Sequence, residues 1–257
     1  MDLGLSGRTA LVLGGSSGLG LAIGQVLSRE GANVVLAARR GDLVRAAASA
    51  MPAALAVETD LTETGAVERV VSDSVAAFGA IDIVILNGGG PAPGQADQLE
   101  TAGIERALHD LFLVNRDLVS AVLPAMRARG WGRIIAVGSS GVQQPLEALA
   151  LSNIGRSALA AYLKTLAADV ARDGVTVNMV LPGRFDTERV SQLDSAAAAR
   201  RGSTAEEIRL GSEAAIPMGR YGRTGEFAAV VAFLASSAAS YVTGEQIRCD
   251  GGMVRSY

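Results

Sequence analysis

Cysteine and histidine are almost absent from this sequence of 257 residues, which contains one of each. The single cysteine, Cys249, cannot form an intrachain disulfide, and without a cluster of His and Cys no zinc site is expected. The sole histidine, His109, lacks partners for a triad or a metal, so a packing or interface role is favoured. We therefore expect no metal and a protein suited to the reducing cytoplasm.

Long apolar runs and clusters of basic residues are missing as well. No segment reaches the uninterrupted apolar length of a membrane span, and the first eight residues have no basic stretch ahead of an apolar run. The net charge is −3, and the cationic residues are scattered rather than interleaved with aromatic residues. We expect a soluble protein that has neither a membrane nor a nucleic acid as a partner.

What the sequence does contain is a regular alternation of short aliphatic runs and longer stretches of helical period. Strands are predicted at 9–13, 33–38, 54–58, 82–86, 133–137, 175–181 and 246–249, and helices near 18–30, 41–50, 64–78, 99–128, 149–172 and 224–237. This alternation predicts one α/β domain over residues 1–257, with a doubly wound, Rossmann-type parallel sheet of about seven strands and helices on both faces.

One long irregular stretch, residues 184–221, follows the carboxyl end of a predicted strand. Doubly wound sheets bind ligands at that end of their strands, and the composition of the stretch suggests a mobile helical lid over the substrate. An ordinary surface insertion is the alternative.

A glycine-rich loop stands between the first predicted strand and the first predicted helix. It reads Gly14-Gly15-Ser16-Ser17-Gly18-Leu19-Gly20. Glycines let the backbone turn sharply and approach a pyrophosphate, whose charge is met by the free N–H groups and the positive end of the helix. The loop predicts a dinucleotide site, and a tight turn without a ligand is the alternative.

Two arginines, Arg39 and Arg40, follow the second predicted strand, where a fold that binds NAD would hold the ribose 2′-hydroxyl with an acidic residue. A guanidinium pairs with a 2′-phosphate through charge-assisted hydrogen bonds, whereas a carboxylate would repel it. The pair predicts NADP(H) as the cofactor. Two solvated arginines at a helix start are the alternative.

Further motifs, in chain order, resemble those of the short-chain dehydrogenase/reductase family over about residues 5 to 253. They are Asp60 and Leu61 in Thr59-Asp60-Leu61, Leu86-Asn87-Gly88-Gly89, Pro182-Gly183, Thr187, and the closing segments 233–235, 241–244 and 250–252. The resemblance implies that Asp60 contacts adenine and that Pro182, Gly183 and Thr187 lie at the nicotinamide. It also implies that Leu86-Asn87-Gly88-Gly89 stands where the family usually has Asn-Asn-Ala-Gly, with Asn87, Gly88 and Gly89 at the cofactor.

The family's reductases use four catalytic side chains: an Asn that holds a water, a Ser that holds the carbonyl oxygen, a Tyr that gives the proton, and a Lys beside it. The resemblance implies that Asn115 and Ser139 are the first two. Counting by the family's spacing puts Ser152 at the Tyr position and Arg156 at the Lys position. The sole lysine, Lys164, lies eight residues past Arg156, about 12 Å along a helix, and is too far away to replace it.

A divergent branch of the family, usually called 3-oxoacyl-[acyl-carrier-protein] reductases by similarity, resembles this chain in two segments. They are Asn87-Gly88-Gly89-Gly90-Pro91 and Leu151-Ser152-Asn153-Ile154-Gly155-Arg156. Two functions follow from the altered site. One is an NADPH-dependent reductase of a small-molecule or acyl-thioester carbonyl compound, with water as the proton source. The other is a catalytically silent NADPH-binding protein that acts as a sensor or partner subunit.

Small side chains in the helix predicted at 149–172, namely Ala158, Ala160 and Ala161, would let that helix pack closely on another. In the family that it resembles, this surface builds a dimer, usually within a tetramer. We therefore expect a homo-oligomer, either a dimer or a tetramer.

Overall fold

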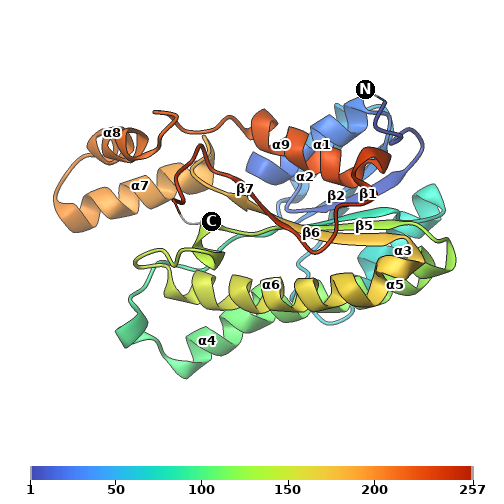
Figure 1. Ribbon diagram of the computed structural model, residues 1–257, viewed down its shortest axis with the longest axis horizontal. Coiled ribbons are helices and arrows are strands. Elements are labelled where there is room, and N and C mark those ends of the chain that lie inside the picture. Colours follow the sequence, from blue (N-terminus) through green and yellow to red (C-terminus); the bar gives the residue numbers. More distant parts are fainter. Residues whose placement is uncertain (1, 256–257) are drawn as a thin grey trace.

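A single parallel sheet forms the centre of the computed structural model, which describes residues 2–255 (Figure 1). Its strands are β1 (Thr9–Leu13), β2 (Asn33–Ala38), β3 (Ala54–Glu58), β4 (Ile83–Leu86), β5 (Gly132–Val137), β6 (Val175–Pro182) and β7 (Gln246–Cys249). They lie in the order β3-β2-β1-β4-β5-β6-β7. The predicted doubly wound sheet is confirmed; Met1 and residues 256–257, which the predicted domain includes, lie outside the described residues.

The strands are apolar throughout because both faces of the sheet are covered. Successive side chains of a strand point to opposite faces, so β1 serves two cores. Ala10 and Val12 belong to one core, while Leu11 and Leu13 belong to the other.

Helices cover both faces (Figure 1). On one side lie α1 (Gly18–Arg29), α2 (Gly41–Ser49) and α9 (Thr224–Ala235), and on the other α3 (Ala66–Phe78), α5 (Val114–Ala128) and α6 (Ala150–Val170). Phe227 of α9 is buried in the first core, and Leu118 of α5 in the second. Among the described helices, none is both long and apolar enough to cross a membrane.

The continuous helix predicted at 99–128 is wrong at one place. The structure has α4 (Thr101–Leu108), then a π-helical turn over His109–Leu113, and then α5. Helix α6 packs closely against this turn, since a Cβ added to Gly155 would lie 2.8 Å from the Leu111 side chain. Hydrophobic periodicity does not distinguish a π turn from an α turn over five residues, and π turns occur frequently at functional sites.

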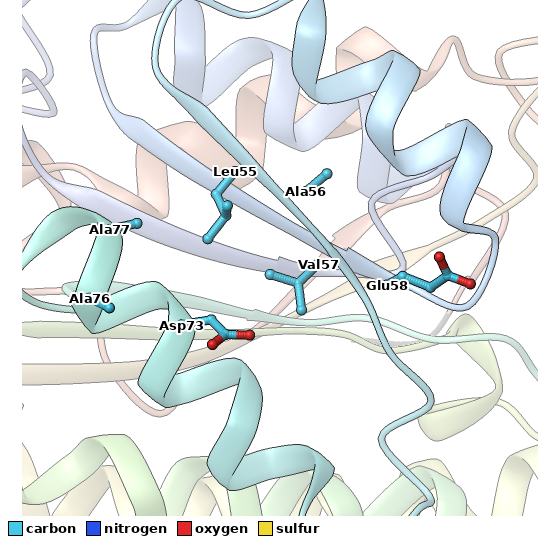
Figure 2. Close-up of a pocket in the computed structure, with 7 residues that line it drawn as sticks. All are labelled: Leu55, Ala56, Val57, Glu58, Asp73, Ala76 and Ala77. Atoms are coloured by element: carbon cyan, nitrogen blue, oxygen red, sulfur yellow. The ribbon is translucent and has the colours of Figure 1, made fainter.

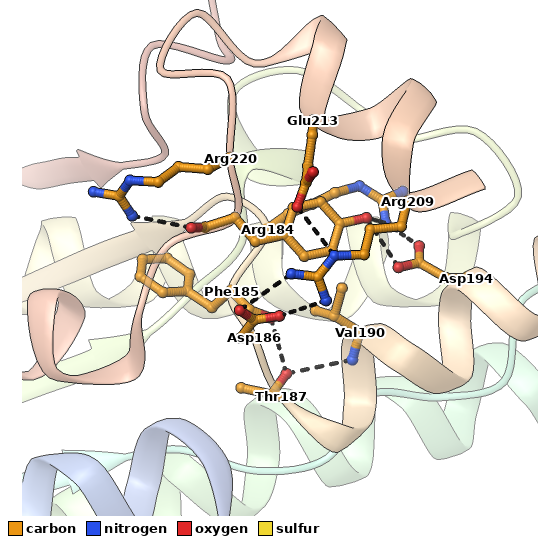
Figure 3. Close-up of polar contacts among 10 residues, drawn as sticks. Arg184, Phe185, Asp186, Thr187, Val190, Asp194, Arg209, Glu213 and Arg220 are labelled. Atoms are coloured by element: carbon orange, nitrogen blue, oxygen red, sulfur yellow. Dashed lines mark hydrogen bonds and ion pairs between the residues drawn. The ribbon is translucent and has the colours of Figure 1, made fainter. Parts of the chain in front are cut away.

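The segment 184–221 contains two helices, α7 (Glu188–Arg201) and α8 (Ala205–Ala215), which project beyond one end of the sheet (Figure 1). A buried carboxylate holds the base of this segment (Figure 3). Asp194 accepts hydrogen bonds from Arg184 Nη1 at 2.5 Å and from the Tyr221 hydroxyl at 2.9 Å. Arg209 of α8 lies over the Tyr221 ring and pairs with Asp186 at 2.8 Å. Both helices are thereby tied to the strand β6 side of the molecule.

A surface hollow of about 530 Å³ lies between the edge strand β3 and helix α3 (Figure 2). It is lined by Leu55, Ala56, Val57, Glu58, Asp73, Ala76 and Ala77. None of these residues belongs to the predicted site. In a doubly wound sheet, ligands bind at the carboxyl ends of the strands where the strand order reverses, and here that point lies between β1 and β4.

Candidate active site

The sheet brings the predicted site residues to one edge. Gly14 directly follows β1 and Asn87 directly follows β4. Ser139 is the second residue after β5, and Pro182 is the last residue of β6. Because all strands are parallel, these positions share the carboxyl edge of the sheet.

The glycine loop has the geometry that the sequence predicted. Gly14 and Gly18 have φ values of +62° and +56°, a region that favours glycine. A Cβ at Gly20 would overlap the carbonyl oxygen of Gly14, so helix α1 packs directly on the loop. Leu19 packs against the core on the α1 side.

The amino end of α1 is left open for an anion. Its N-cap residue, Ser17, makes no side-chain capping bond, and its first turn has no acidic residue. Among residues 2–255, the free N–H groups and the positive end of the helix therefore have no side-chain partner that would compete with a phosphate.

Arg40 reaches back to the glycine loop. Its Nη2 atom donates to the hydroxyls of Ser16, at 3.4 Å, and Ser17, while Nη1 pairs with Glu188 of α7 at 3.4 Å. Arg39 is three-quarters exposed and pairs with Asp60 at 3.9 Å. The Arg40 guanidinium therefore lies beside the loop, where it could pair with a ribose 2′-phosphate, while Arg39 is held by Asp60.

Asp60 has a fixed orientation. The backbone N–H and hydroxyl of Thr62 both donate to its Oδ1, and with the charge of Arg39 they lower the pKa of this carboxyl. Leu61 packs against the core on the α3 side. A fixed carboxylate can accept hydrogen bonds from a neighbouring amine, which suits the adenine contact expected from the resemblance.

The loop after β4 lies next to the glycine loop. The Nδ2 atom of Asn87 donates to the carbonyl oxygen of Leu13 at 3.0 Å and thereby joins the two loops. Added Cβ atoms at Gly88 and Gly89 would meet no heavy atom within 4 Å. The backbone beside Asn87 is therefore accessible to a ligand.

Thr187, which follows β6, lies next to the glycine loop. It is the N-cap of α7, with its hydroxyl accepting from the N–H of Val190 at 3.3 Å, and its methyl carbon lies 3.6 Å from a Cβ placed on Gly18. Gly183 packs on Asp250, whose Cα atom would lie 2.7 Å from an added Cβ. The Pro182-Gly183 turn thus has no room for a larger residue at its second position.

The Ser139 hydroxyl makes one hydrogen bond within the described protein, as an acceptor. Its Oγ accepts a hydrogen bond from the N–H of Gly141 at 3.0 Å, as the N-cap of a short 3₁₀ turn. A hydroxyl has one donor and two acceptor sites, so its proton is free to be donated to another oxygen.

Arg156 and Ser152 form a pair on the first turns of α6. Arg156 Nη1 donates to the carbonyl oxygen of Val137 at 2.7 Å, and its Nε donates to Ser152 Oγ at 3.3 Å. Burial, with the charge of Arg189 as a second cause, lowers the pKa of Arg156 to about 10. Arg156 is therefore a cation at neutral pH that is bonded to Val137, the last residue of β5, two positions before Ser139 in sequence.

Asn115 follows the π turn, and its Nδ2 atom donates to the Leu111 carbonyl oxygen at 2.9 Å. Its Oδ1 atom accepts no hydrogen bond from the described residues. The side chain is thus oriented by the π turn and keeps an acceptor that can hold a water.

Lys164 and Tyr162 do not substitute for Arg156 and Ser152. Lys164 donates to the carbonyl oxygen of Gly244 at 2.8 Å, and the N–H of Gly244 donates to Val177 in the early part of β6, away from the carboxyl edge of the sheet. Tyr162 packs edge-on against Phe112, with ring centroids 5.7 Å apart. Within residues 2–255 no group of three or more His, Cys, Asp or Glu side chains could hold a metal ion.

Two further side chains, those of Asn153 and Arg189, hold loops near the site, and the sequence motifs assign neither of them a role of its own. Asn153 Nδ2 donates to the carbonyl oxygen of Leu146 at 3.0 Å and so fixes the loop that follows Ser139. Arg189 of α7 donates to the carbonyl oxygen of Pro91 at 2.8 Å and so connects α7 with the loop after β4. No sequence signal marks the contact of Arg189, because it joins segments 98 residues apart, whereas Asn153 contacts a loop only seven residues before it.

The comparisons with known proteins agree with this geometry. A protein-family model described as enoyl-(acyl carrier protein) reductase matches residues 14–254. The 3-oxoacyl-[acyl-carrier-protein] reductase FabG of Escherichia coli K12 is 32% identical over 256 residues, which cover 98% of this chain and 99% of that protein. The chain belongs to the short-chain dehydrogenase/reductase family.

Other members of the short-chain dehydrogenase/reductase family differ in their named substrates. The cyclohexanol dehydrogenase of a Rhodococcus species is 31% identical, with 99% of both chains covered. The L-sorbose reductase of Gluconobacter frateurii, solved with NADPH and L-sorbose, is 30% identical with a TM-score of 0.94 and complete coverage of both chains. The chain is therefore an oxidoreductase, and the family alone does not identify its substrate.

Proposed function

We propose that the protein is an NADPH-dependent reductase of a carbonyl compound, with an atypical site in which Ser152 and Arg156 stand in place of the family's Tyr and Lys. One observation carries the proposal. The Ser139 hydroxyl keeps a free proton beside the strand end to which the cationic Arg156 is bonded. A hydrogen-bond donor and a positive charge are what a carbonyl oxygen needs while it becomes an alkoxide.

The chain binds NADP(H). The open end of α1, the glycine backbone at Gly88 and Gly89, and the Arg40 guanidinium beside the loop suit a dinucleotide with a 2′-phosphate. The Gluconobacter reductase, solved with NADPH, shares the fold over its full length.

When bound, the reduced nicotinamide supplies a hydride to the carbonyl carbon. Ser139 then orients the carbonyl oxygen, and Arg156 stabilises the negative charge that develops on it. Arg156 is always cationic at neutral pH and does not give up a proton. We infer that a water bound by Ser152, whose Oγ already accepts from Arg156, donates the proton to the oxygen.

Residues 184–221 act in this proposal as a lid. Thr187 lies at the glycine loop and Arg189 at the loop after β4, so α7 contacts both sides of the expected cofactor position. We also propose a homodimer or homotetramer, a cytoplasmic location and a substrate that is a small molecule or an acyl thioester. Two apolar residues that are about one-third exposed, Leu113 beside α5 and Ile154 on α6, support the assembly.

A second candidate function is NADPH binding without turnover, as a sensor or partner subunit. It is favoured by the position of Tyr162, whose ring packs on Phe112 rather than beside Arg156. Losing a general acid lowers the rate by about 10²- to 10⁴-fold, which still leaves measurable hydride transfer.

A direct test measures NADPH binding by fluorescence and then NADPH oxidation at high protein concentration with ketones, quinones, oxo acids and 3-oxoacyl thioesters. The reductase proposal expects slow but enzyme-dependent oxidation with at least one class. Tight NADPH binding with no oxidation by any class would favour the second function.

Arg40→Ala is expected to weaken NADPH binding by about 10- to 100-fold, because the charge-assisted hydrogen bonds to the 2′-phosphate are lost. NADH binding, which involves no such phosphate, should hardly change, and Arg39→Asp should erase or invert the preference for NADPH. Titration of cofactor fluorescence measures both affinities. Arg45→Ala is the matched control, since Arg45 is paired with Asp42 and Glu58; equal losses for NADPH and NADH in Arg40→Ala would contradict the assignment.

A further inference from the structure

Two cationic side chains reach adjacent strand ends from different elements. Arg189, the second residue of α7, extends to Pro91 in the loop after β4, with an Nη2–O distance of 2.8 Å. Arg156 of α6 extends to Val137 at the end of β5. Strands β4 and β5 are neighbours in the sheet, so the two guanidinium groups approach the same region from the lid and from the sheet side.

Neither arginine has an acidic partner. Each contacts backbone carbonyl oxygens, with Ser152 as the only side-chain contact, and neither makes an ion pair with the described residues. By contrast, Arg184, Arg209 and Arg220 of the same lid segment are all paired with carboxylates. The charge of Arg189 also helps to lower the pKa of Arg156, so the two cations repel each other in a partly buried place.

Two neighbouring cations without a counter-ion are unfavourable when water is excluded, and an anion between them removes that cost. A guanidinium binds a carboxylate through two parallel hydrogen bonds, which gives a specific orientation as well as affinity.

A reductase site can bind two kinds of anionic group, the phosphates of the cofactor and a charged group of the substrate. The position of Arg189 indicates which of the two it contacts. Cofactor phosphates are expected at the glycine loop after β1, next to Thr187 and the open end of α1. Arg189 instead lies beside Gly90 and bonds to Pro91, and it is near enough to Arg156 for its charge to lower the pKa of that residue. It therefore lies toward the reacting carbonyl group rather than toward the phosphates.

We propose that Arg189 is a specificity-determining residue that binds the carboxylate of an oxo-acid substrate whose carbonyl oxygen lies at Ser139 and Arg156. The inference rests on the reductase proposal and narrows it from carbonyl compounds in general to oxo acids. Because Arg189 belongs to α7, the substrate carboxylate would also hold the lid against the loop after β4.

The test compares short 2-oxo and 3-oxo acids with their methyl esters, which keep the carbonyl group and lose the charge. The unmodified protein should have a higher kcat/KM for at least one acid than for its ester. Arg189→Gln should lower kcat/KM for that acid by about 30- to 100-fold, the effect of losing a charge-assisted bidentate pair, with little change for the ester. Arg189→Lys should restore part of the loss, and Arg201→Gln, at the far end of α7, is the matched control.

NADPH affinity is measured for the same variants and should be unchanged in Arg189→Gln. An equal loss for acid and ester together with weaker NADPH binding would place Arg189 at the cofactor phosphates and overturn the proposal. Equal kcat/KM for acids and esters in the unmodified protein would overturn it as well.

A binding measurement separates this inference from the reductase proposal. Oxo acids are titrated into the complex of protein and NADPH, and the NADPH fluorescence is followed for the unmodified chain and for Arg189→Gln. Acid binding that Arg189→Gln abolishes supports the carboxylate site even if no NADPH is oxidised. If the NADPH complex of the unmodified protein binds none of the acids, the inference is wrong whatever the outcome of the turnover assay.

Discussion

Ser139→Ala is expected to lower kcat by about 10²- to 10³-fold, the usual result of removing one donor to a developing oxyanion. The Ser139 hydroxyl accepts from Gly141 and has its proton left for the substrate oxygen, so alanine removes that donor and leaves the strand end in place. NADPH affinity should be unchanged, because Ser139 contacts the substrate and not the cofactor. Steady-state kinetics and a fluorescence titration measure the two effects separately.

Ser152→Ala provides the comparison for Ser139→Ala. Its hydroxyl is proposed to hold a water rather than the substrate oxygen, and a second water can occupy the space that alanine leaves. We expect a smaller loss of kcat than for Ser139→Ala. If the two variants lose equal activity, or if Ser139→Ala weakens NADPH binding to the same degree as it lowers kcat, the assignment of Ser139 to the carbonyl oxygen is wrong.

Asp194→Ala is expected to be the most destabilising single change in residues 184–221. The carboxylate is buried and accepts from both Arg184 and Tyr221, so alanine leaves a cation and a phenol without their partner. Removing one member of a buried pair costs about 3 kcal/mol or more. Thermal unfolding should show a fall in Tm of roughly 6 to 12 °C for a chain of this size.

Asp186→Ala is the matched control for Asp194→Ala. Asp186 also pairs with an arginine of the lid segment, Arg209 at 2.8 Å, but its side chain is half exposed (Figure 3). Exposed ion pairs contribute about 1 kcal/mol or less. Equal stability of the two variants would show that the Asp194 cluster does not hold the lid segment.

The sheet and the glycine loop could be predicted from the sequence because their signals are local. Each strand is a short run of buried aliphatic residues, and the loop stands directly between β1 and α1. Strands 9–13, 33–38, 54–58 and 246–249 were predicted with the bounds that the structure has.

The rest of the site could not be predicted, because it depends on contacts between distant segments. Arg189 meets Pro91 across 98 positions of sequence, and Arg184 and Asp194 reach Tyr221 across the two lid helices. Arg156 was placed by counting along the chain, but its bond to the carbonyl oxygen of Val137 follows from the packing of α6 on the sheet. In each case the partner is a backbone atom or a side chain that the local sequence does not mark.

The π turn over His109–Leu113 makes the placement of Asn115 sensitive to chain length rather than to side-chain identity. A π turn holds one residue more than an α turn, so it is the form that a single-residue insertion takes within a helix. Deleting one residue from this turn would let α4 and α5 join as one regular helix. Because the π turn takes up the extra residue within one wider turn, the deletion would leave the faces of α4 and α5 nearly in phase, but it would remove the widened turn whose Leu111 carbonyl oxygen accepts from Asn115. A change in length by one codon in this segment would therefore act on Asn115 through the hydrogen bond that orients its side chain.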